Sequence, residues 1–239
     1  MISKIKYKRV LLKISGEALL GKKPYGLDPQ MVNFLANEIK KVYIRKIQIS
    51  VVVGGGNIFR GHNAASVGIE RTTADYMGML GTVINALALQ SALEKNNVHT
   101  RVLSSIPIPA VCESYIRRRA INHMKKKRVI IFAAGTGNPY FTTDTAAALR
   151  ASETSSDLIL KGTQVDGVYT EDPKKNKKAT KYDVISYKDV LSKNLKIMDG
   201  SAVALARDNK IPIVVFPINK QNSFLNVILN KGNFTIIKK

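Results

Sequence analysis

Cysteine is almost absent from this chain, carboxylates are scarce, and long apolar runs are missing. Cys112 is the only cysteine, so an intrachain disulfide is excluded and a reducing cytoplasm is the natural setting. No apolar run approaches the length that a bilayer span requires. The first ten residues, MISKIKYKRV, lack the apolar core of a signal peptide. These absences favour an intracellular globular protein.

The shortage of carboxylates leaves a strongly basic chain. There are 38 Lys and Arg against 17 Asp and Glu, which gives a net charge of +21 and a pI near 10.0. Such a charge normally suggests a nucleic acid or another acidic partner. However, the basic clusters are not interleaved with aromatics as a base-stacking surface would be, and no helix-turn-helix, zinc-finger or RNP motif is present. We therefore interpret the clusters as solvated faces and loops, with a basic nucleic-acid-binding protein kept as the alternative from another class.

Apolar, β-branched runs alternate with helical patterns along the whole chain. This alternation predicts an α/β fold, a three-layer αβα sandwich with a mainly parallel central sheet. The 239 residues and a hydrophobic content of 45% suit one such domain. Strands are predicted near residues 8–14, 47–53, 98–104, 128–133, 157–161, 212–216 and 234–237.

Helical patterns fill the intervals between these strands. Asp28 and Pro29 form a helix start, with a capping carboxylate and a proline at the first helical position. The longest helix is predicted from about 73 to 95, with an apolar face of Met77, Leu80, Ile84 and Leu87. Met77 and Met79 are expected in the core. Further helices are predicted at 113–125, 143–154, 199–209 and 222–230.

The segment VIIFAAGTGNPYFTTD, residues 129–144, is the most informative in the chain. A buried strand ends at small residues and glycines, and hydroxyls and a carboxylate precede a helix. Gly135 and Gly137 allow a sharp turn that brings main-chain N–H groups close to a ligand. A strand, a glycine turn and a helix N-terminus together predict an anion site.

Two further glycine turns follow predicted strands. Gly54-Gly55-Gly56 comes after residues 49–53, and Ser15-Gly16 comes after residues 10–14. Open α/β sheets bind ligands at the carboxyl ends of their strands, where all three turns are predicted. Residues 16–22, GEALLGK, match the first seven positions of a P-loop, but Lys23 stands where the magnesium-binding hydroxyl is required. We interpret that match as chance.

Five segments together resemble one family. KISGEAL (13–19), GGGNIFRG (54–61), RTTADYMGML (71–80), AGTGNPYFTTD (134–144) and KGTQVDGVYTEDP (161–173) closely resemble the bacterial UMP kinases of the amino acid kinase superfamily. The resemblance continues through MDGSAVALARD (198–208) and covers nearly the whole chain. It implies one amino acid kinase domain over 1–239, in which the N-terminal part binds UMP and oligomerises and about 160–239 binds ATP. The activity implied is transfer of the ATP γ-phosphoryl group to UMP, in pyrimidine nucleotide biosynthesis.

The resemblance also implies roles for individual residues. The expected catalytic residues are Lys13, Asp144, Lys161 and Asp199, with Asp144 organising the two lysines rather than acting as a base. The expected ATP-binding residues are Lys13, Ile14, Ser15, Gly16, Gly56, Arg60, Thr163, Tyr169 and Asp172. The expected UMP-binding residues are Gly55, Asp75, Thr136, Gly137, Asn138, Pro139, Tyr140, Phe141, Thr142 and Thr143. Asp75 is expected to receive ribose hydroxyls, and it can at the same time be a first-turn helix carboxylate.

Cofactor, partners and regulation follow from the same resemblance. Mg²⁺ is expected with the ATP phosphates, and no histidine has the spacing of a metal ligand. The family is typically homohexameric, inhibited by UTP and often activated by GTP. Gln90, Ser91 and Glu94 stand where well-known members carry basic GTP contacts, although Arg101 and Arg128 remain, so we predict weak or absent GTP activation. The nearest alternative is a superfamily member that phosphorylates a carboxylate or a carbamate.

Overall fold

The computed structural model describes residues 7–59, 68–171, 175, 176 and 178–239. Nine strands of the described chain form one sheet: β1 (Arg9–Ile14), β2 (Gln48–Val53), β3 (Thr100–Ser104), β4 (Glu113–Ser114), β5 (Val129–Ala133), β6 (Leu158–Thr163), β9 (Val184–Ser186), β10 (Ile213–Pro217) and β11 (Thr235–Lys238). Their order is β4-β3-β5-β2-β1-β6-β10-β11-β9, and within this sheet only β10 and β11 run antiparallel to each other. Two short strands, β7 (Val168–Tyr169) and β8 (Lys181–Tyr182), pair separately.

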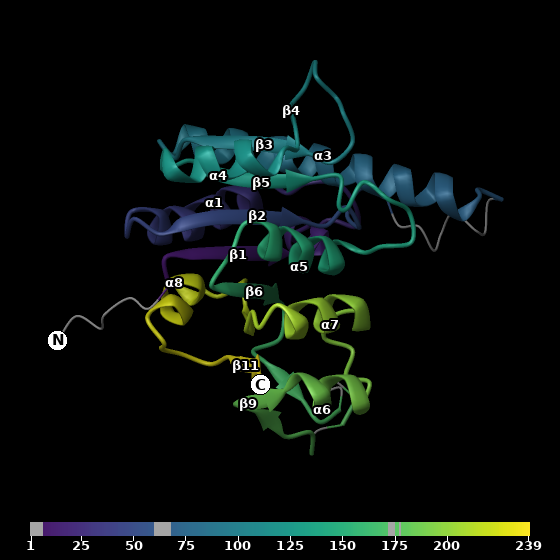
Figure 1. The fold of residues 1–239 in the computed structure, drawn as a ribbon, viewed down its shortest axis with the longest axis vertical. Helices are drawn as coiled ribbons and strands as arrows, with labels where there is room; N and C mark the ends of the chain where they lie inside the picture. The colour runs from purple at the N-terminus through teal and green to yellow at the C-terminus, as the bar shows by residue number, and fades with distance from the viewer. Residues whose placement is uncertain (1–6, 60–67, 172–174, 177) are drawn as a thin grey trace.

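Helices cover both faces of the sheet (Figure 1). On one face lie α1 (Pro29–Tyr43), α3 (Arg71–Lys95) and α8 (Ser223–Ile228). On the other face lie α4 (Arg117–Lys125), α5 (Thr143–Glu153), α6 (Tyr187–Ser192) and α7 (Gly200–Asp208). A 3-10 turn, η1 (Gly16–Leu19), follows β1 directly. This confirms the predicted three-layer sandwich with a mainly parallel sheet.

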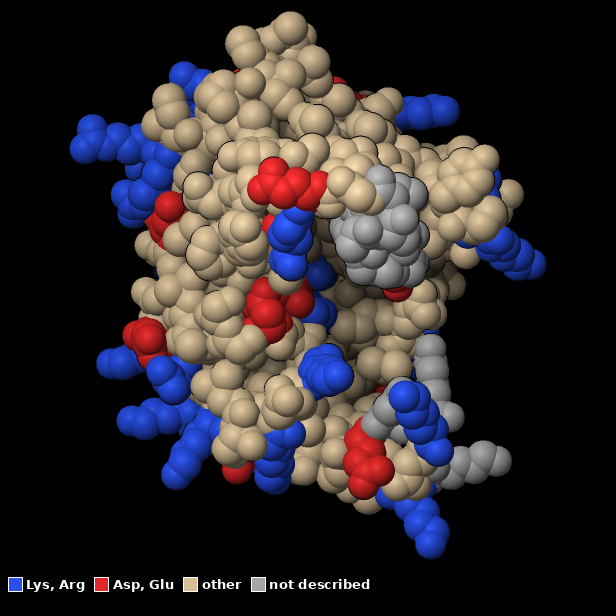
Figure 2. Space-filling model, turned by 90° about the vertical axis from the view of Figure 1, so that its right-hand side faces the viewer, with Lys and Arg blue, Asp and Glu red and all other residues tan. Residues whose placement is uncertain are grey.

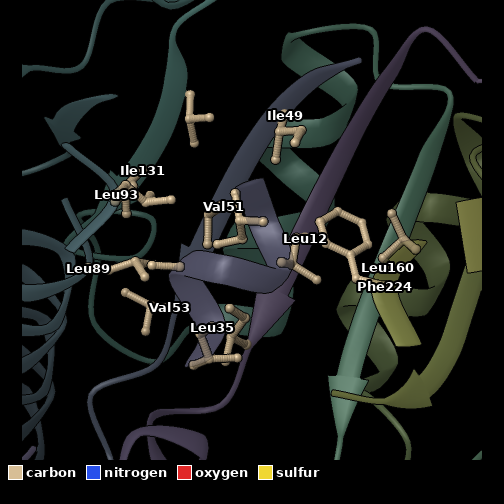
Figure 3. Packing of buried hydrophobic residues seen from close by; sticks show 14 of the residues in the cluster. Leu12, Leu35, Ile49, Val51, Val53, Leu89, Leu93, Ile131, Leu160 and Phe224 are labelled. Atoms are coloured by element: carbon tan, nitrogen blue, oxygen red, sulfur yellow. The ribbon is translucent and has the colours of Figure 1, made fainter. Parts of the chain in front are cut away.

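The central strands are buried on both faces, which explains why they read as continuous apolar runs. In β1, Leu12 packs toward α1 and α3 while Leu11 packs toward α5 and α7. The same alternation divides Val51 from Val52 in the neighbouring strand. Figure 3 shows the first of these two cores, where strand side chains meet Leu35, Leu89 and Phe224 of three helices. Both cores hold the carboxyl ends of the strands in fixed register.

Most predicted elements are found within one or two residues of their expected ends. Asp28 caps α1 by accepting from the Gln30 N–H, with Pro29 at the first helical position. The prediction of a helix over 113–125 is wrong at its start, because β4 occupies Glu113–Ser114 and α4 begins at Arg117. The sequence reading missed β7, β8, β9 and α6. These elements have two to six residues, too few to show a periodicity.

The apolar face expected of the longest helix is not its core face. Leu80 and Ile84 are each 48% exposed and Met77 is only half-buried, whereas Met79 is buried as predicted. The core face is formed instead by Met79, Val83, Ala86, Leu89 and Leu93. By length and composition alone α3 could span a membrane, but core helices of soluble proteins can have the same length and composition. Half of its most apolar 18-residue stretch is buried inside the protein.

Candidate active site

The turns after β1 and β2 pack directly against each other at the carboxyl edge of the sheet. A Cβ on Gly16 would lie 2.5 Å from Asn57 Oδ1 and 2.9 Å from the Gly56 nitrogen, so only glycine fits there. Gly55 is equally enclosed, because a Cβ would lie 2.4 Å from the Gly78 carbonyl oxygen of α3. Figure 2 shows the face that carries this edge, with a hollow near its centre into which basic side chains reach. The sequence placed the glycine turns here correctly.

Two lysines lie side by side at this edge because of strand register. Lys13 of β1 and Lys161 of β6 are direct partners in the parallel pairing of the two strands. Asp144, in the first turn of α5, lies between them: its Oδ1 is 2.6 Å from Lys13 Nζ and its Oδ2 is 2.6 Å from Lys161 Nζ. All three side chains are at least 87% buried, because their exposed fractions are 8%, 12% and 13%. Two positive charges and one negative charge leave a buried site with a net positive charge.

The electrostatics of this cluster are dominated by burial and by mutual charge. Burial alone would raise the pKa of Asp144, but the ammonium groups of Lys13 and Lys161 outweigh it and lower that pKa below its ordinary value. Burial lowers the pKa of Lys161, and the positive charge of Lys13 lowers it further against the opposing pull of Asp144. Asp144 is therefore a firmly ionised carboxylate of low basicity, and both of its oxygens are engaged by ammonium groups, which makes it a poor general base.

Asp199 supports this cluster from α7 rather than joining it. As the cap of α7 it accepts from the Ala202 N–H at 3.0 Å. Its other oxygen accepts from the hydroxyls of Thr142 and Thr145, which flank Asp144 in the sequence. Thr142 in turn caps α5 by accepting from the Asp144 N–H at 3.0 Å. Asp199 thus fixes the start of the helix that carries Asp144.

A cleft of about 720 Å³ opens beside the lysine pair. Its walls include four residues that the sequence proposes for ATP, namely Lys13, Ser15, Thr163 and Tyr169, and also Lys161, which is expected to be catalytic. The Tyr169 hydroxyl donates to Asp166 at 2.6 Å, which raises the Tyr169 pKa and fixes the ring at the rim. A volume of this order suits a nucleotide-sized ligand.

Of the other residues predicted to bind ATP, those that the structure describes are not among the residues that line the cleft. The Ile14 side chain is completely buried, so only its main chain faces the site, and Gly56 lies in the turn after β2. Arg60 and Asp172 fall outside the described residues.

Sequence reasoning missed the far wall of the cleft. Lys193, Leu195 and Ile197, in the loop between α6 and α7, line it together with Val165 and Val215. This loop has no glycine motif, and the short α6 before it was not predicted. A pair of apolar residues among lysines was the only signal available in the sequence.

The loop between β5 and α5 contains most of the residues proposed for UMP. Asn138 and the rings of Tyr140 and Phe141 are exposed, the two rings at 67% and 52%, which is unusual for large side chains that bind no partner. The Asp75 carboxylate accepts from the Tyr140 N–H at 2.8 Å and pairs with Arg71 Nε at 2.9 Å. Since α3 begins at Arg71, Asp75 lies beyond its first turn, and the first-turn interpretation is wrong. The structure thus brings Asp75 together with the loop at Tyr140.

The carboxylates of the site are committed to protein donors. Asp144 is held by two ammonium groups, and Asp199 by three hydroxyls and an N–H. Among the described residues, no three His, Cys, Asp or Glu side chains stand close enough to hold a metal ion. These donors fit a magnesium ion that arrives on nucleotide phosphates, the usual mode for Mg²⁺ in phosphoryl transfer.

Comparison with known proteins identifies the family of the chain. Residues 8–217 match the sequence model of the Amino acid kinase family. The chain is 58% identical over 237 residues to a uridylate kinase of Paramagnetospirillum magneticum, covering 99% of each chain. It is 57% identical over 235 residues to a uridylate kinase of Wolbachia sp. subsp. Brugia malayi, covering 98% of this chain and 95% of that protein. The crystal structure of a UMP kinase from Bacillus anthracis superposes with a TM-score of 0.94 at 43% identity, covering 97% of this chain and 96% of that one. The chain belongs to the amino acid kinase family.

Proposed function

We propose that this protein is a UMP kinase, which transfers the γ-phosphoryl group of ATP to UMP reversibly and gives UDP and ADP. The observation that carries the proposal is the buried Lys13–Asp144–Lys161 cluster at the junction of a donor-sized cleft and the loop at 134–143. The uridylate kinases and UMP kinase to which the chain is similar support UMP as the acceptor.

The chemistry requires positioning and charge neutralisation more than proton transfer. A phosphate oxygen of UMP attacks the γ-phosphorus of ATP and forms the new P–O bond. The bond from the γ-phosphorus to the β–γ bridging oxygen breaks, and ADP leaves with that electron pair. Lys13 and Lys161 neutralise the charge on the transferring group, and Asp144 holds both ammonium groups in place. No base is needed, because the attacking phosphate oxygen is already ionised at neutral pH.

The two nucleotides use different parts of the chain. We assign ATP mainly to about 160–239 and to the turn after β1, and UMP mainly to the N-terminal part. The residues assigned to ATP are Lys13, Ile14, Ser15, Gly16, Gly56, Arg60, Thr163, Tyr169 and Asp172. The residues assigned to UMP are Gly55, Asp75 and Thr136 to Thr143. Magnesium bound to the ATP phosphates supplies further charge neutralisation for the leaving group.

Self-association is the second part of the proposal. The outward face of α3 presents Leu80 and Ile84, each 48% exposed, and Tyr76, 42% exposed. Apolar side chains repeated at helical spacing without a charge among them suit contact with a second copy of the same helix. We propose a homo-oligomer built on this face, with the hexamer implied by the family resemblance as its full form.

Regulation follows from which sites nucleotides can enter. UTP is the expected inhibitor, because its uracil and ribose fit the acceptor site. For GTP, the positions expected to be basic carry Gln90, Ser91 and Glu94 instead. Arg101 Nη1 lies 3.3 Å from Glu94 Oε1, and Arg101 Nε lies 3.9 Å from Glu113 Oε1. Arg128 donates to His123 Nδ1 at 3.0 Å. Because these arginines already have partners, we propose weak or absent activation by GTP. The setting we propose is the cytoplasm, in the pathway that supplies UTP and CTP.

The test is UDP formation from UMP by the purified protein with Mg-ATP. CMP and a reaction without acceptor are the controls. Rapid UDP formation, much slower use of CMP and loss of turnover in Asp144→Asn support the proposal. No UMP-dependent turnover in a folded, oligomeric sample refutes it, and acidic amino acids and carbamate are then tested as acceptors. A nucleic-acid-binding protein would instead show salt-sensitive RNA binding that survives Asp144→Asn.

A further inference from the structure

The loop at 134–143, which we assign to UMP and call the acceptor loop, opens with a turn whose backbone conformation is unfavourable. Ala134 and Gly135 both lie in the left-handed region, with φ values of 59° and 55°. Glycine adopts this conformation readily, but alanine does so at a cost, because its Cβ approaches the backbone. The Gly137 N–H donates to the Ala134 carbonyl at 2.9 Å and closes the turn. One such bond does not explain why two successive residues hold this conformation, and further contacts fix the turn from outside.

The first external contact comes from α3. Thr82, only 2% exposed, uses its hydroxyl oxygen to accept from the Ala134 N–H at 2.7 Å. The same hydroxyl donates to the Met79 carbonyl at 2.6 Å, so its proton is committed to the helix. Thr82 Oγ1 is therefore a fixed acceptor for the strained residue.

The second contact comes from the residue after β3. The Ser105 hydroxyl donates to the Gly135 carbonyl at 2.9 Å and accepts from Arg150 Nη2 at 2.8 Å. A guanidinium group only donates, so the serine proton must go to the Gly135 carbonyl. The Ser105 N–H also donates to the Ala133 carbonyl at 3.1 Å, which fixes the serine against the end of β5.

Arg150 is itself held rigidly behind Ser105. It is 4% exposed, donates to Glu153 Oε2 at 2.6 Å and lies 3.8 Å from the centre of the Tyr115 ring. The Tyr115 hydroxyl donates to the same Glu153 oxygen. A guanidinium fixed in this way sets the direction of the serine hydroxyl that accepts from it.

These contacts fix one peptide plane of the acceptor loop. The peptide group is planar and trans, so the Thr136 N–H points to the opposite side from the Gly135 carbonyl that Ser105 holds. We propose that Thr82 and Ser105 form a hydroxyl clamp, which positions the Ala134–Thr136 turn so that the Thr136 N–H is presented to the acceptor nucleotide. Arg150 is the positioning residue that orients Ser105. The inference rests on the proposed function, since it assigns the turn to UMP.

A purely structural role makes a different prediction from the clamp. Hydroxyls that only stabilise the fold, whether buried as in Thr82 or half-buried as in Ser105, would affect the KM values for UMP and ATP alike or leave both unchanged. The clamp acts on one side of the site, because ATP is assigned to the turn after β1 and to the cleft beside β6. The decisive readout is therefore KM for UMP against KM for ATP, measured with kcat and the melting temperature.

Thr82→Val and Ser105→Ala are the test variants, and each has a matched control. Thr100→Val removes another buried threonine hydroxyl, which donates to the Val98 carbonyl at the opposite end of β3. Ser104→Ala removes the neighbouring buried hydroxyl, which donates to the Ile106 carbonyl. Thr82→Ser keeps the hydroxyl and serves as the rescue.

Each clamp variant is expected to raise KM for UMP about tenfold, the factor for loss of one hydrogen bond that orders a binding group. KM for ATP is expected to stay within about twofold, and Thr82→Ser and both controls are expected to match the wild type. An unchanged KM for UMP in either folded clamp variant overturns the inference, and so does an equal rise for both nucleotides. If the wild type makes no UDP, the proposed function itself has failed, which is a distinct result.

Discussion

Replacing Asp144 with asparagine tests the central cluster directly. The change keeps the shape of the side chain but removes the one negative charge between Lys13 and Lys161, whose ammonium nitrogens each lie 2.6 Å from a carboxylate oxygen. The asparagine amide can accept from one lysine through its oxygen, but its NH₂ group then faces the other ammonium. The variant therefore has two buried cations and no counter-ion.

The cost follows from burial. Removing one partner of a buried ion pair destabilises a protein by about 3–5 kcal/mol. Because each ammonium nitrogen lies 2.6 Å from its own carboxylate oxygen, the two nitrogens are at most about 7 Å apart. At that separation an effective dielectric constant of about 20 gives a repulsion of at least about 2 kcal/mol. Lys161 limits this cost by losing its proton, because burial already lowers its pKa. At about 2–4 °C per kcal/mol for a chain of this size, we expect the melting temperature to fall by about 10 °C.

Catalysis suffers more than binding does. With Asp144 gone, the lysines are no longer held for the transferring phosphoryl group, and loss of one such preorganised interaction lowers kcat by about 10²–10³. The phosphates of ATP supply the missing negative charge in the ground state. KM for ATP is therefore expected to stay unchanged or to fall, whereas a residue that simply bound ATP would raise it on removal.

Steady-state kinetics give kcat and KM for ATP, and calorimetry on the same preparations gives the melting temperature. Asp157→Asn is the control, because Asp157 lies just before β6, at the opposite end from Lys161, and accepts from the main-chain N–H groups of Lys8 and Arg9. That variant is expected to retain wild-type kcat. If Asp144→Asn keeps kcat within about threefold of the wild type, the cluster does not organise phosphoryl transfer and the reasoning is refuted.

Three other predictions concern pH, assembly and regulation. Because the pKa of Lys161 is lowered, its charge is lost at a lower pH than that of an ordinary lysine, so kcat is expected to begin to fall before a free lysine would titrate. An identical pH profile in an active Lys161→Arg variant would assign the fall to another group, such as the uracil ring. Leu80→Glu with Ile84→Glu is expected to lower the oligomer mass in light scattering, and an unchanged mass would exclude that face of α3. Millimolar GTP is expected to leave the rate at subsaturating UMP unchanged, and a several-fold rise would show that the Glu94–Arg101 pair does not block the site.

The sequence predicted the sheet well because its strands are buried on both sides. A strand such as Val129–Ala133 is apolar at every position, and the glycine turn that follows marks its end clearly. The family resemblance grouped Lys13, Asp144 and Lys161, and the structure brings the three side chains into contact, while their catalytic role stays a prediction. Their geometry was beyond the sequence, because the contact depends on the register between β1 and β6 and on the placement of α5.

Elements with no local signal were missed, and so were contacts made by uncharged polar residues. Asn85 on α3 donates to the Gly54 carbonyl at 2.6 Å and exchanges hydrogen bonds with Asn57, and both side chains are buried. A lone asparagine in an apolar helix predicts no partner 28 residues away. Thr82 gave no signal either, since a threonine in a helix more often bonds to its own backbone.

The misread face of α3 has a physical explanation that joins these observations. Asp75, Gly78, Thr82 and Asn85 recur at helical spacing and face the two glycine turns and the acceptor loop. Leu80 and Ile84 lie on the opposite side of the same helix and are exposed. A surface helix normally buries its apolar stripe and exposes its polar one. Here α3 buries an apolar stripe as usual, with Met79, Val83 and Leu89, and it also buries the polar stripe, whose groups are satisfied internally. The second apolar stripe, at Leu80 and Ile84, is the one left for the proposed contact between copies. One helix would then carry both the acceptor site and the contact between copies, so assembly fixes the helix to which the loop at 134–143 is bound.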